Sequence, residues 1–322
     1  MNFKHWAAAL ALASTASLAL AQSWPAAKPI RLIVGYPPGG GIDFTARTVQ
    51  VPLQKALGQQ IVLEYKPGAS GMIAAAELTR TAPDGYTLLL ANTGPFAIAP
   101  YLQAKKPYDP LTQFTYIGQI SQGSYIAVTR PDHPANDLKQ WVEWVRANAG
   151  KAHYASGGTG TSTHLNGELM NQAVGLNVTH VPYKGSAPAI QDLIGGQTQL
   201  LIDVGSVLLP QVKGGKLKAL AVTGPQRDPL LPDIPTVREL GLGAMESVGF
   251  QGLVAPATLP QPIIDRLAAE LTKVLAQPEI KARFEAAGAQ VHPLGAAEFA
   301  AFVKAENEKW ARLIRERKLQ LD

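Results

Sequence analysis

Three consecutive glycines are the residues of this chain whose type and spacing best suit anion binding. They lie between an apolar segment, residues 30–34, and a helical pattern that begins near Phe44. Glycines leave the backbone N–H groups uncovered, and a helix start adds unpaired N–H groups and the positive end of its dipole. Such a turn predicts a bound carboxylate or phosphate, and a strand-to-helix turn without a ligand is the alternative. The candidate residues are Gly39, Gly40, Gly41, Ile42 and Asp43.

A second glycine-rich loop repeats this design further along the chain. It follows a predicted strand at 153–155 and precedes a helical pattern that begins at Leu165. Its threonine and serine hydroxyls are of the kind that most often caps helix N-termini. The two loops together predict two anion seats, one in each half of the chain. The candidates in the second loop are Gly160, Thr161, Ser162, Thr163 and His164.

Polar residues at the ends of other predicted strands are the remaining binding candidates. In open α/β sheets, ligands bind beyond the carboxyl ends of the strands. Asn92 and Thr93 follow the third predicted strand and would offer side-chain donors beside the triple glycine. Tyr183 and Lys184 close a later strand, and the lysine would face a carboxylate. Asp203 would orient that lysine or accept from a ligand amine or hydroxyl, with ordinary turns and solvated ion pairs as the alternatives.

Several chemistries are disfavoured by what the sequence lacks. Neither loop is followed by the Gly-Lys-Ser/Thr of a nucleotide-binding P-loop, and neither matches the dinucleotide fingerprint G-x-G-x-x-G. The chain has no Cys, which removes thiol catalysis and zinc–thiolate sites. Its histidines have no metal-ligand spacing. We therefore expect no cofactor and no metal.

A catalytic serine is the alternative chemistry that these residues leave open. Ser162 and His164 are two positions apart, so on a helix they point to different faces. The loop also has His164 where the nucleophile elbow G-x-S-x-G requires its last glycine. We expect a protein that is not an enzyme, with an exported hydrolase that uses Ser162 and a distant base as the alternative.

The first residues have the pattern of a secretory signal peptide. Lys4 precedes an apolar run at 6–20, and Ala19-Leu20-Ala21 forms a cleavage motif. We predict cleavage after Ala21 and a soluble exported protein, with an uncleaved N-terminal anchor as the alternative. The net charge of +5 over 322 residues is mild and dispersed, so nucleic acid is not expected as a partner. The protein is expected to be a monomer.

Strand and helix patterns alternate along the chain, which is typical of parallel sheets covered by helices on both faces. Apolar runs predict strands at 30–34, 61–65, 86–91, 116–120, 125–129, 153–155, 178–183, 200–203, 217–223 and 249–254. Apolar spacing and caps predict helices at 44–57, 72–80, 138–147, 165–174, 189–194, 207–213, 261–275, 278–286 and 296–315. Pro52 should kink or break the first helix. The chain is expected to cross between domains near 121–124 and to return through strand 249–254.

Seven motifs, in order along the chain, resemble those of the tripartite tricarboxylate transporter solute-binding receptors, also called the Bug family. They are 36–43 (YPPGGGID), 67–71 (PGASG), 82–88 (APDGYTL), 108–110 (YDP), 160–165 (GTSTHL), 180–188 (HVPYKGSAP) and 231–237 (LPDIPTV). The resemblance covers nearly all of the chain that follows the signal peptide.

This resemblance implies a two-lobed periplasmic-binding-protein type II fold, in which each lobe is a mainly parallel sheet flanked by helices and hinge strands cross between them. Lobe 1 would comprise residues 22–123 and 248–322, and lobe 2 would comprise residues 124–247. The lobes would close on a di- or tricarboxylate, an acidic amino acid or an aromatic carboxylate, held mainly by backbone N–H groups of the two glycine loops. The implied partners are the membrane components of a tripartite tricarboxylate transporter, or a sensor kinase in a sensory role.

One departure from the family pattern lies in the first loop. The family often has Thr after the third glycine, where this chain has Ile42. The substitution removes a hydroxyl and makes that wall of the pocket more apolar. Together with Phe44 it hints at a larger or aromatic carboxylate, and a place for Phe44 in the core is the alternative.

Overall fold

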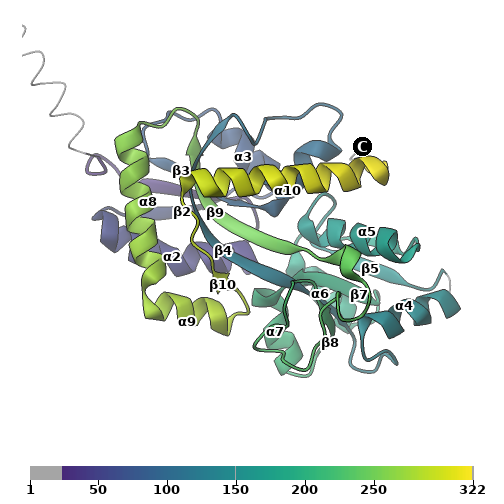
Figure 1. The fold of residues 1–322 in the computed structure, drawn as a ribbon. Coiled ribbons are helices and arrows are strands. Elements are labelled where there is room, and N and C mark those ends of the chain that lie inside the picture. Colours follow the sequence, from purple (N-terminus) through teal and green to yellow (C-terminus); the bar gives the residue numbers. More distant parts are fainter. Residues whose placement is uncertain (1–23, 149, 321–322) are drawn as a thin grey trace, which may run out of the picture.

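The computed structural model describes residues 24–148 and 150–320 of the chain (Figure 1). The predicted signal peptide and its cleavage after Ala21 lie outside these residues. Within the described ranges, no helix combines the length and the apolar character that crossing a membrane requires.

The strands all belong to one curled, mixed sheet. They are β1 (Ile30–Val34), β2 (Ile61–Tyr65), β3 (Thr87–Asn92), β4 (Phe114–Thr129), β5 (His153–Ser156), β6 (Thr179–Pro182), β7 (Leu200–Val204), β8 (Lys218–Val222), β9 (Val248–Pro256) and β10 (Gln290–Val291).

Helices flank this sheet along its whole length. They are α2 (Gly41–Leu57), α3 (Met72–Leu78), α4 (Leu138–Ala147), α5 (Ser162–Val174), α6 (Ser186–Ile194), α7 (Gly205–Lys213), α8 (Gln261–Ala276), α9 (Pro278–Ala286) and α10 (Ala296–Glu316). Shorter turns at Ala69–Gly71, Ala99–Leu102 and Gly243–Met245 are 3₁₀-helical, and Gly94–Ile98 is a π-helix. The α/β fold class predicted from the sequence is confirmed.

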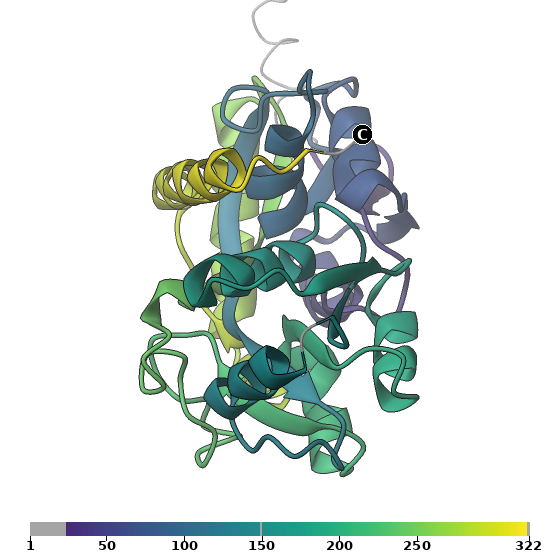
Figure 2. The same cartoon turned by 90° about the vertical axis from the view of Figure 1, so that its right-hand side faces the viewer.

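Two lobes share the sheet. Its main path runs β2-β1-β3-β9-β4-β7-β5-β6. In what we call lobe 1, β1 pairs in parallel with β2 and β3; in lobe 2, β5 pairs in parallel with β6 and β7. Figure 1 shows α2, α8 and α9 beside the first set of strands and α4 to α7 around the second. From the side, one lobe lies above the other and β4 runs between them (Figure 2). The residue boundaries of the lobes stay a prediction.

The crossing strands differ from the expectation in one respect. The sequence predicted two strands, 116–120 and 125–129, whereas β4 is one continuous strand from Phe114 to Thr129. The prediction was wrong because the polar stretch 121–124 interrupts the apolar pattern, yet its backbone stays paired with β9, down to Ser124 opposite Val248. Strand β9 runs antiparallel beside this stretch. The passage between lobes near 121–124 and the return through 249–254 stay predictions.

Helix α2 positions the triple glycine and runs on past its proline. It begins at Gly41, three residues before the expected start, and ends where Gly58 adopts a left-handed conformation with φ of 70°. Pro52 was expected to kink or break it, but a single helix extends from Gly41 to Leu57. One face is buried against the sheet, including Val49 and Leu53, and this packing holds the helix through the proline.

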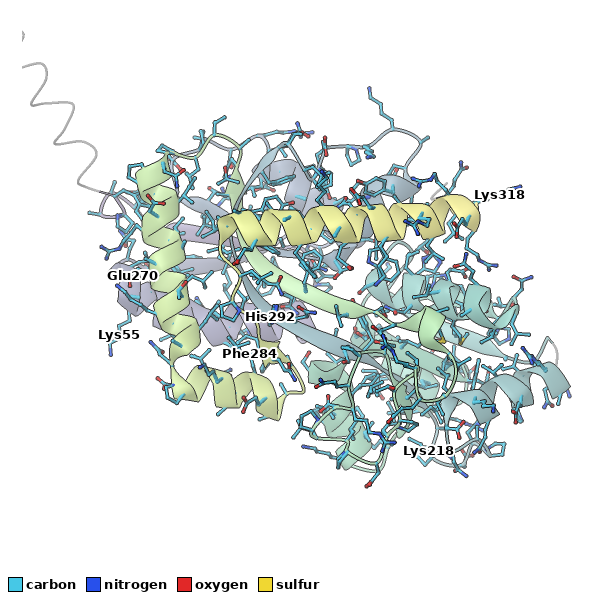
Figure 3. The ribbon with its side chains drawn as sticks, viewed as in Figure 1. Lys55, Lys218, Glu270, Phe284, His292 and Lys318 are labelled. Atoms are coloured by element: carbon cyan, nitrogen blue, oxygen red, sulfur yellow. The ribbon has the colours of Figure 1, made fainter. Side chains whose placement is uncertain are left out.

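Lobe 1 is held together by apolar packing between its sheet and helices. All six residues of β3 are buried, as expected for a strand covered on both faces. The ring of Phe44 on α2 meets that of Phe284 on α9 edge-to-face, with centroids 5.6 Å apart. Figure 3 shows Phe284 on α9, on the side of this helix that faces α2. Phe44 is therefore partly a packing residue, which was the alternative weighed from the sequence.

Candidate functional site

A cavity of about 110 Å³ lies between the lobes, at the ends of their strands. It brings together most of the residues that the sequence singled out. Those that line it are Gly39, Gly40, Gly41, Ile42, Asn92, Thr161, Ser162, Thr163, Lys184 and Asp203. A smaller cavity of about 50 Å³ adjoins it and shares Ile42, Asn92, Ser162, Val204 and Gln251 with it.

Helix N-termini are the dominant feature of the cavity wall. Helices α2, α5 and α6 begin at Gly41, Ser162 and Ser186, which all line the main cavity. Helix α7 begins at Gly205, which lines the smaller one. The first N–H groups of a helix have no partner within it, and the helix dipole adds partial positive charge there. Three such ends at the main cavity, with a fourth at the adjoining one, make a strong seat for an anion.

Backbone N–H groups are left available at three of these ends. In the described part of the chain, no side chain caps α2, α6 or α7, whereas Thr161 caps α5 by accepting from the N–H of His164. The two loops predicted as anion seats therefore face each other across the cavity, one from each lobe. The sequence did not predict the contributions of α6 and α7.

Asp43 stabilises the conformation of the triple-glycine loop by a hydrogen bond. Gly39 has φ of 88°, a left-handed conformation that glycine adopts without strain. Its N–H donates to the Asp43 carboxylate at 2.9 Å, which also accepts from Arg47 at 2.8 Å and from Tyr65. Burial raises the pKa of Asp43, but these hydrogen bonds outweigh it and hold the pKa below its ordinary value. Asp43, a predicted binding residue, thus supports the loop and does not line the cavity.

His164 and Gly160 likewise act within the second loop and not on the cavity surface. The Nδ1 of His164 accepts from the Gly160 N–H at 3.2 Å, and its ring stacks on His180 with centroids 4.1 Å apart. Burial lowers the pKa of His164 to about 4 and that of His180 to about 3. Both rings are therefore neutral at pH 7, and neither supplies a positive charge to the site.

Tyr183 and Thr93 also lie outside the main cavity. The Tyr183 hydroxyl donates to Asp192 at 2.7 Å, and Tyr183 does not line the main cavity. Thr93 is buried, lines the smaller cavity and accepts from the Phe250 N–H at 3.2 Å. The role of Thr93 in binding stays a prediction.

Two charged side chains line the main cavity, one of each sign. Lys184 is exposed at its rim, whereas Asp203 is only 3% exposed. Asp203 Oδ1 accepts from the Val204 N–H at 2.7 Å, and Oδ2 has no hydrogen-bond partner among the described residues. Burial raises the pKa of Asp203 to about 6. Hydrogen bonds from the Ser186 side chain and the Val204 N–H lower this pKa, but they offset the effect of burial only in part. The cavity thus contains a carboxylate whose surroundings favour its neutral form.

Ser162, the nucleophile of the hydrolase alternative, lines the main cavity. Among residues 24–148 and 150–320, no histidine is hydrogen-bonded to its hydroxyl, and the Ser–His pair in this region is Ser156 with His180, 2.6 Å apart. Ser156 is completely buried and does not line the cavity. Within the same described ranges, no cluster of His, Asp and Glu side chains is arranged to hold a metal ion.

The family follows from a comparison with known proteins. The tripartite tricarboxylate transporter family receptor model matches residues 45–319. The chain belongs to this receptor family. The resemblance found in the sequence is therefore confirmed, and the family is one of periplasmic solute-binding receptors. The protein BugT of Bordetella pertussis is 31% identical over 308 residues, which make up 95% of this chain and 94% of BugT.

Solved structures of similar receptors have the same fold. The periplasmic binding protein BugD is 35% identical, with a TM-score of 0.86 over 91% of this chain and 99% of that one. MatC of Rhodopseudomonas palustris, with bound malate, is 30% identical, with a TM-score of 0.85 over 90% and 99% of the two chains. Rpa4515 of R. palustris, with adipate, is 28% identical, with a TM-score of 0.86 over 91% and 97%. The predicted periplasmic-binding-protein fold is confirmed.

The receptor's cavity also contains residues that the sequence did not nominate. They are Tyr36, Pro37, Pro38, Gly157, Gly185, Ser186, Ala187, Pro188, Val204 and Gln251. Ser186 lies in the 180–188 motif, and recognition of a helix start there would have identified it. Gln251 had no comparable signal, because its place depends on how β9 crosses between the lobes.

Proposed function

We propose that this receptor captures a small organic carboxylate between its lobes in the periplasm and delivers it to the membrane components of a tripartite tricarboxylate-type transporter. The observation that carries the proposal is the convergence of the α2, α5 and α6 N-termini on the main interlobe cavity, with the α7 N-terminus at the adjoining one. These helix ends come from both lobes, so an anion between them would favour the closed form. Malate and adipate in the related structures are carboxylates, which supports the same ligand class here.

Binding without catalysis accounts for the side chains of the site. A hydrolase needs a nucleophile with a base in hydrogen-bond reach, and Ser162 has no histidine partner in the described ranges. Binding requires only donors that match the ligand, which the helix ends supply. We infer that the chain is a receptor and not an enzyme, exported by cleavage after Ala21. Docking to a sensor kinase stays an alternative, and no particular contact favours it.

Thermal unfolding of protein purified from the periplasm tests this proposal. The panel comprises di- and tricarboxylates, acidic amino acids and aromatic carboxylates, with matched uncharged amides as controls. Because a ligand that binds only the folded state stabilises it, at least one carboxylate should raise the melting temperature while its amide does not. The absence of a shift with every carboxylate, or an equal shift with the amides, would overturn the proposal.

A further inference from the structure

Four consecutive residues of lobe 1 have backbone conformations that favour glycine. In the loop between β2 and α3, φ is 130° at Gly68, 45° at Ala69, 56° at Ser70 and 87° at Gly71. Alanine and serine rarely adopt positive φ, and backbone strain of this kind persists where the surrounding structure holds it in place, commonly at functional sites. Residues 67–71 do not line either interlobe cavity, so ligand contact does not account for this loop.

Contacts within lobe 1 hold the loop in this conformation. A Cβ at Gly71 would lie 3.2 Å from Pro95 Cγ and 3.2 Å from Tyr36 Cε2, so the loop backbone packs closely against both residues. The Tyr36 hydroxyl donates to the Ser70 carbonyl at 2.9 Å and accepts from Asn92 Nδ2 at 3.4 Å. Burial raises the pKa of Tyr36 to about 12, so this hydroxyl keeps its proton at pH 7 and remains a donor. These contacts fix the position of Ser70.

The side chain of Ser70 reaches the other lobe. Its hydroxyl donates to the carbonyl oxygen of Thr159, which lies between β5 and α5 in lobe 2. Thr159 follows Gly157 by two residues, and Gly157 lines the main cavity, as Tyr36 does. The hydrogen bond therefore joins the two lobes beside the cavity. Ala69 has the same left-handed conformation but no side-chain donor.

We propose that Ser70 is a positioning residue for ligand capture, whose hydrogen bond to the Thr159 carbonyl holds the lobes together in the closed form and slows the release of a bound carboxylate. The inference rests on the proposed function, because the bond can act on release only if the lobes close on a ligand. Opening of the lobes would break it, whereas the contacts of the loop with Tyr36 lie within lobe 1 and would persist. The serine is kept at a strained position because its hydroxyl is needed there.

The proposal separates the two rate constants of binding. The bond between Ser70 and Thr159 forms only when the lobes meet, so it is absent when a carboxylate first encounters the open protein. It must be broken before the carboxylate leaves. Loss of the hydroxyl should therefore raise the dissociation rate and leave the association rate nearly unchanged. A residue that merely stabilised its own loop would not produce this separation.

Three variants distinguish the hydroxyl from the backbone strain. Ser70→Ala removes the donor and keeps the strain, Ser70→Gly removes both, and Ala69→Gly relieves the neighbouring strain while the donor stays in place. Both Ser70 variants should raise the dissociation rate about threefold to tenfold, the effect of one hydrogen bond, and Ala69→Gly should leave it unchanged. If Ser70→Ala does not fold, Ser70→Gly decides, because it lacks the same donor without the strain.

Surface plasmon resonance on the immobilised protein at pH 7.5 measures both rate constants. The probes are malate, adipate, citrate, glutamate and phthalate, which represent the carboxylate classes of the proposed function. With each probe that binds, the two Ser70 variants should change the dissociation rate as stated. Their association rates should stay within about twofold of that of the unaltered protein.

The outcomes separate this inference from the proposed function. An unchanged dissociation rate in the Ser70 variants overturns the inference and leaves the receptor function intact. The same holds if the association rate falls as much as the dissociation rate rises, or if Ala69→Gly raises the dissociation rate equally, because the loop conformation is then responsible. If none of the five carboxylates binds the unaltered protein, the proposed function fails and the inference fails with it.

Discussion

At the residue scale, Asp203 sets a pH dependence of stability that can be measured. Burial raises its pKa to about 6 from an ordinary value of 3.8, so the folded protein holds this proton at a higher pH than the unfolded chain. Stability from this group therefore falls as pH rises from about 4 to about 6 and stays lower above that window. Replacement of the Asp203 carboxylate by a neutral isostere should remove this loss of stability at higher pH.

Asp203→Asn is accordingly expected to stabilise the ligand-free protein at pH 7.5, by up to about 3 kcal/mol. At pH 4 the gain should nearly vanish, because the native carboxyl is then protonated. Urea unfolding at the two pH values measures the difference, with Asp233→Asn as the exposed control. An equal effect of Asp203→Asn at both pH values would contradict this account of the site.

Some residues of this site could be predicted from the sequence, and others could not. Glycines and hydroxyls at the starts of α2 and α5 were visible because local loop chemistry alone marks a helix N-terminus. Asp43 and His164 were nominated from the same loops but lie behind them, because local sequence does not tell which side of a loop faces the ligand. Gln251 was missed, since its position arises from the crossing of β9.

At the element scale, the start of α2 meets the start of α7 across the cavity. A Cβ at Gly41 would lie 2.8 Å from Ser206 Oγ and 2.8 Å from Val204 Cγ2, both in lobe 2. Gly41→Ala should therefore oppose closure and weaken carboxylate binding about tenfold or more, since overpacking of this kind costs about 1–3 kcal/mol. Titration calorimetry with the best carboxylate of the thermal panel measures the affinity.

Gly40→Ala is the matched control for the expected effect of Gly41→Ala on lobe closure. A Cβ at Gly40 would meet only the Pro37 carbonyl, at 4.0 Å, and its φ of −93° suits alanine. Small-angle scattering at saturating ligand should find Gly41→Ala more open than the unaltered protein and Gly40→Ala equally closed. Equal radii of gyration for both variants would contradict the proposed contact between α2 and α7.

The proline in α2 gives a second prediction at this scale. Pro52 has no N–H to donate within the helix, yet α2 continues to Leu57. Pro52→Ala should stabilise the protein by about 1–3 kcal/mol without changing its ligand affinity, because residue 52 does not line either interlobe cavity. Denaturant unfolding measures the change in stability, and calorimetry measures the ligand affinity. A loss of stability would show that the proline is required for packing.

Most elements were predictable from periodicity, and the failures have local physical causes. Helices α5, α6 and α7 begin two or three residues before their predicted starts, because their first residues, Ser162-Thr163, Ser186-Ala187-Pro188 and Gly205-Ser206, lack large apolar side chains. Strand β4 was divided at 121–124 because that stretch is polar where it passes the smaller cavity. In each case, residues at an interlobe cavity interrupted the apolar pattern of the core.

At the scale of the whole molecule, α10 joins the two lobes outside the cavity. Its Asn307 donates to the Phe96 carbonyl in lobe 1 at 2.7 Å. Beyond its last turn, Arg317 reaches the largely buried Glu168 of α5 at 2.9 Å. Figure 1 shows α10 extending from the lobe 1 helices towards α5. These contacts connect the C-terminal segment to both lobes.

Arg317→Met should lower the free energy of unfolding by about 1–3 kcal/mol, because Glu168 then stays buried with fewer donors. Tyr154 would still donate to it at 2.8 Å, which limits the loss. The matched control is Arg312→Met, since Arg312 is exposed on the same helix. Urea unfolding of both variants checks the prediction, and equal stability of the two would show that the ion pair contributes nothing.

The two-lobed architecture was predictable chiefly because motifs along the chain resemble those of one receptor family. Periodicity alone indicated parallel sheets with helices, but not which helix ends would meet. The positions of the α6 and α7 starts at the two adjoining cavities depend on how the lobes are arranged around β4 and β9. Such placement arises from tertiary packing, which a pattern in one stretch of sequence does not encode.

A crystal structure with the best-binding carboxylate tests the central claim most directly. The account predicts that one carboxylate group of the ligand lies between the N–H groups of residues 40–42 and those of residues 162–163, with the lobes closed around it. A ligand bound elsewhere, or one whose carboxylate points away from both helix ends, would contradict it.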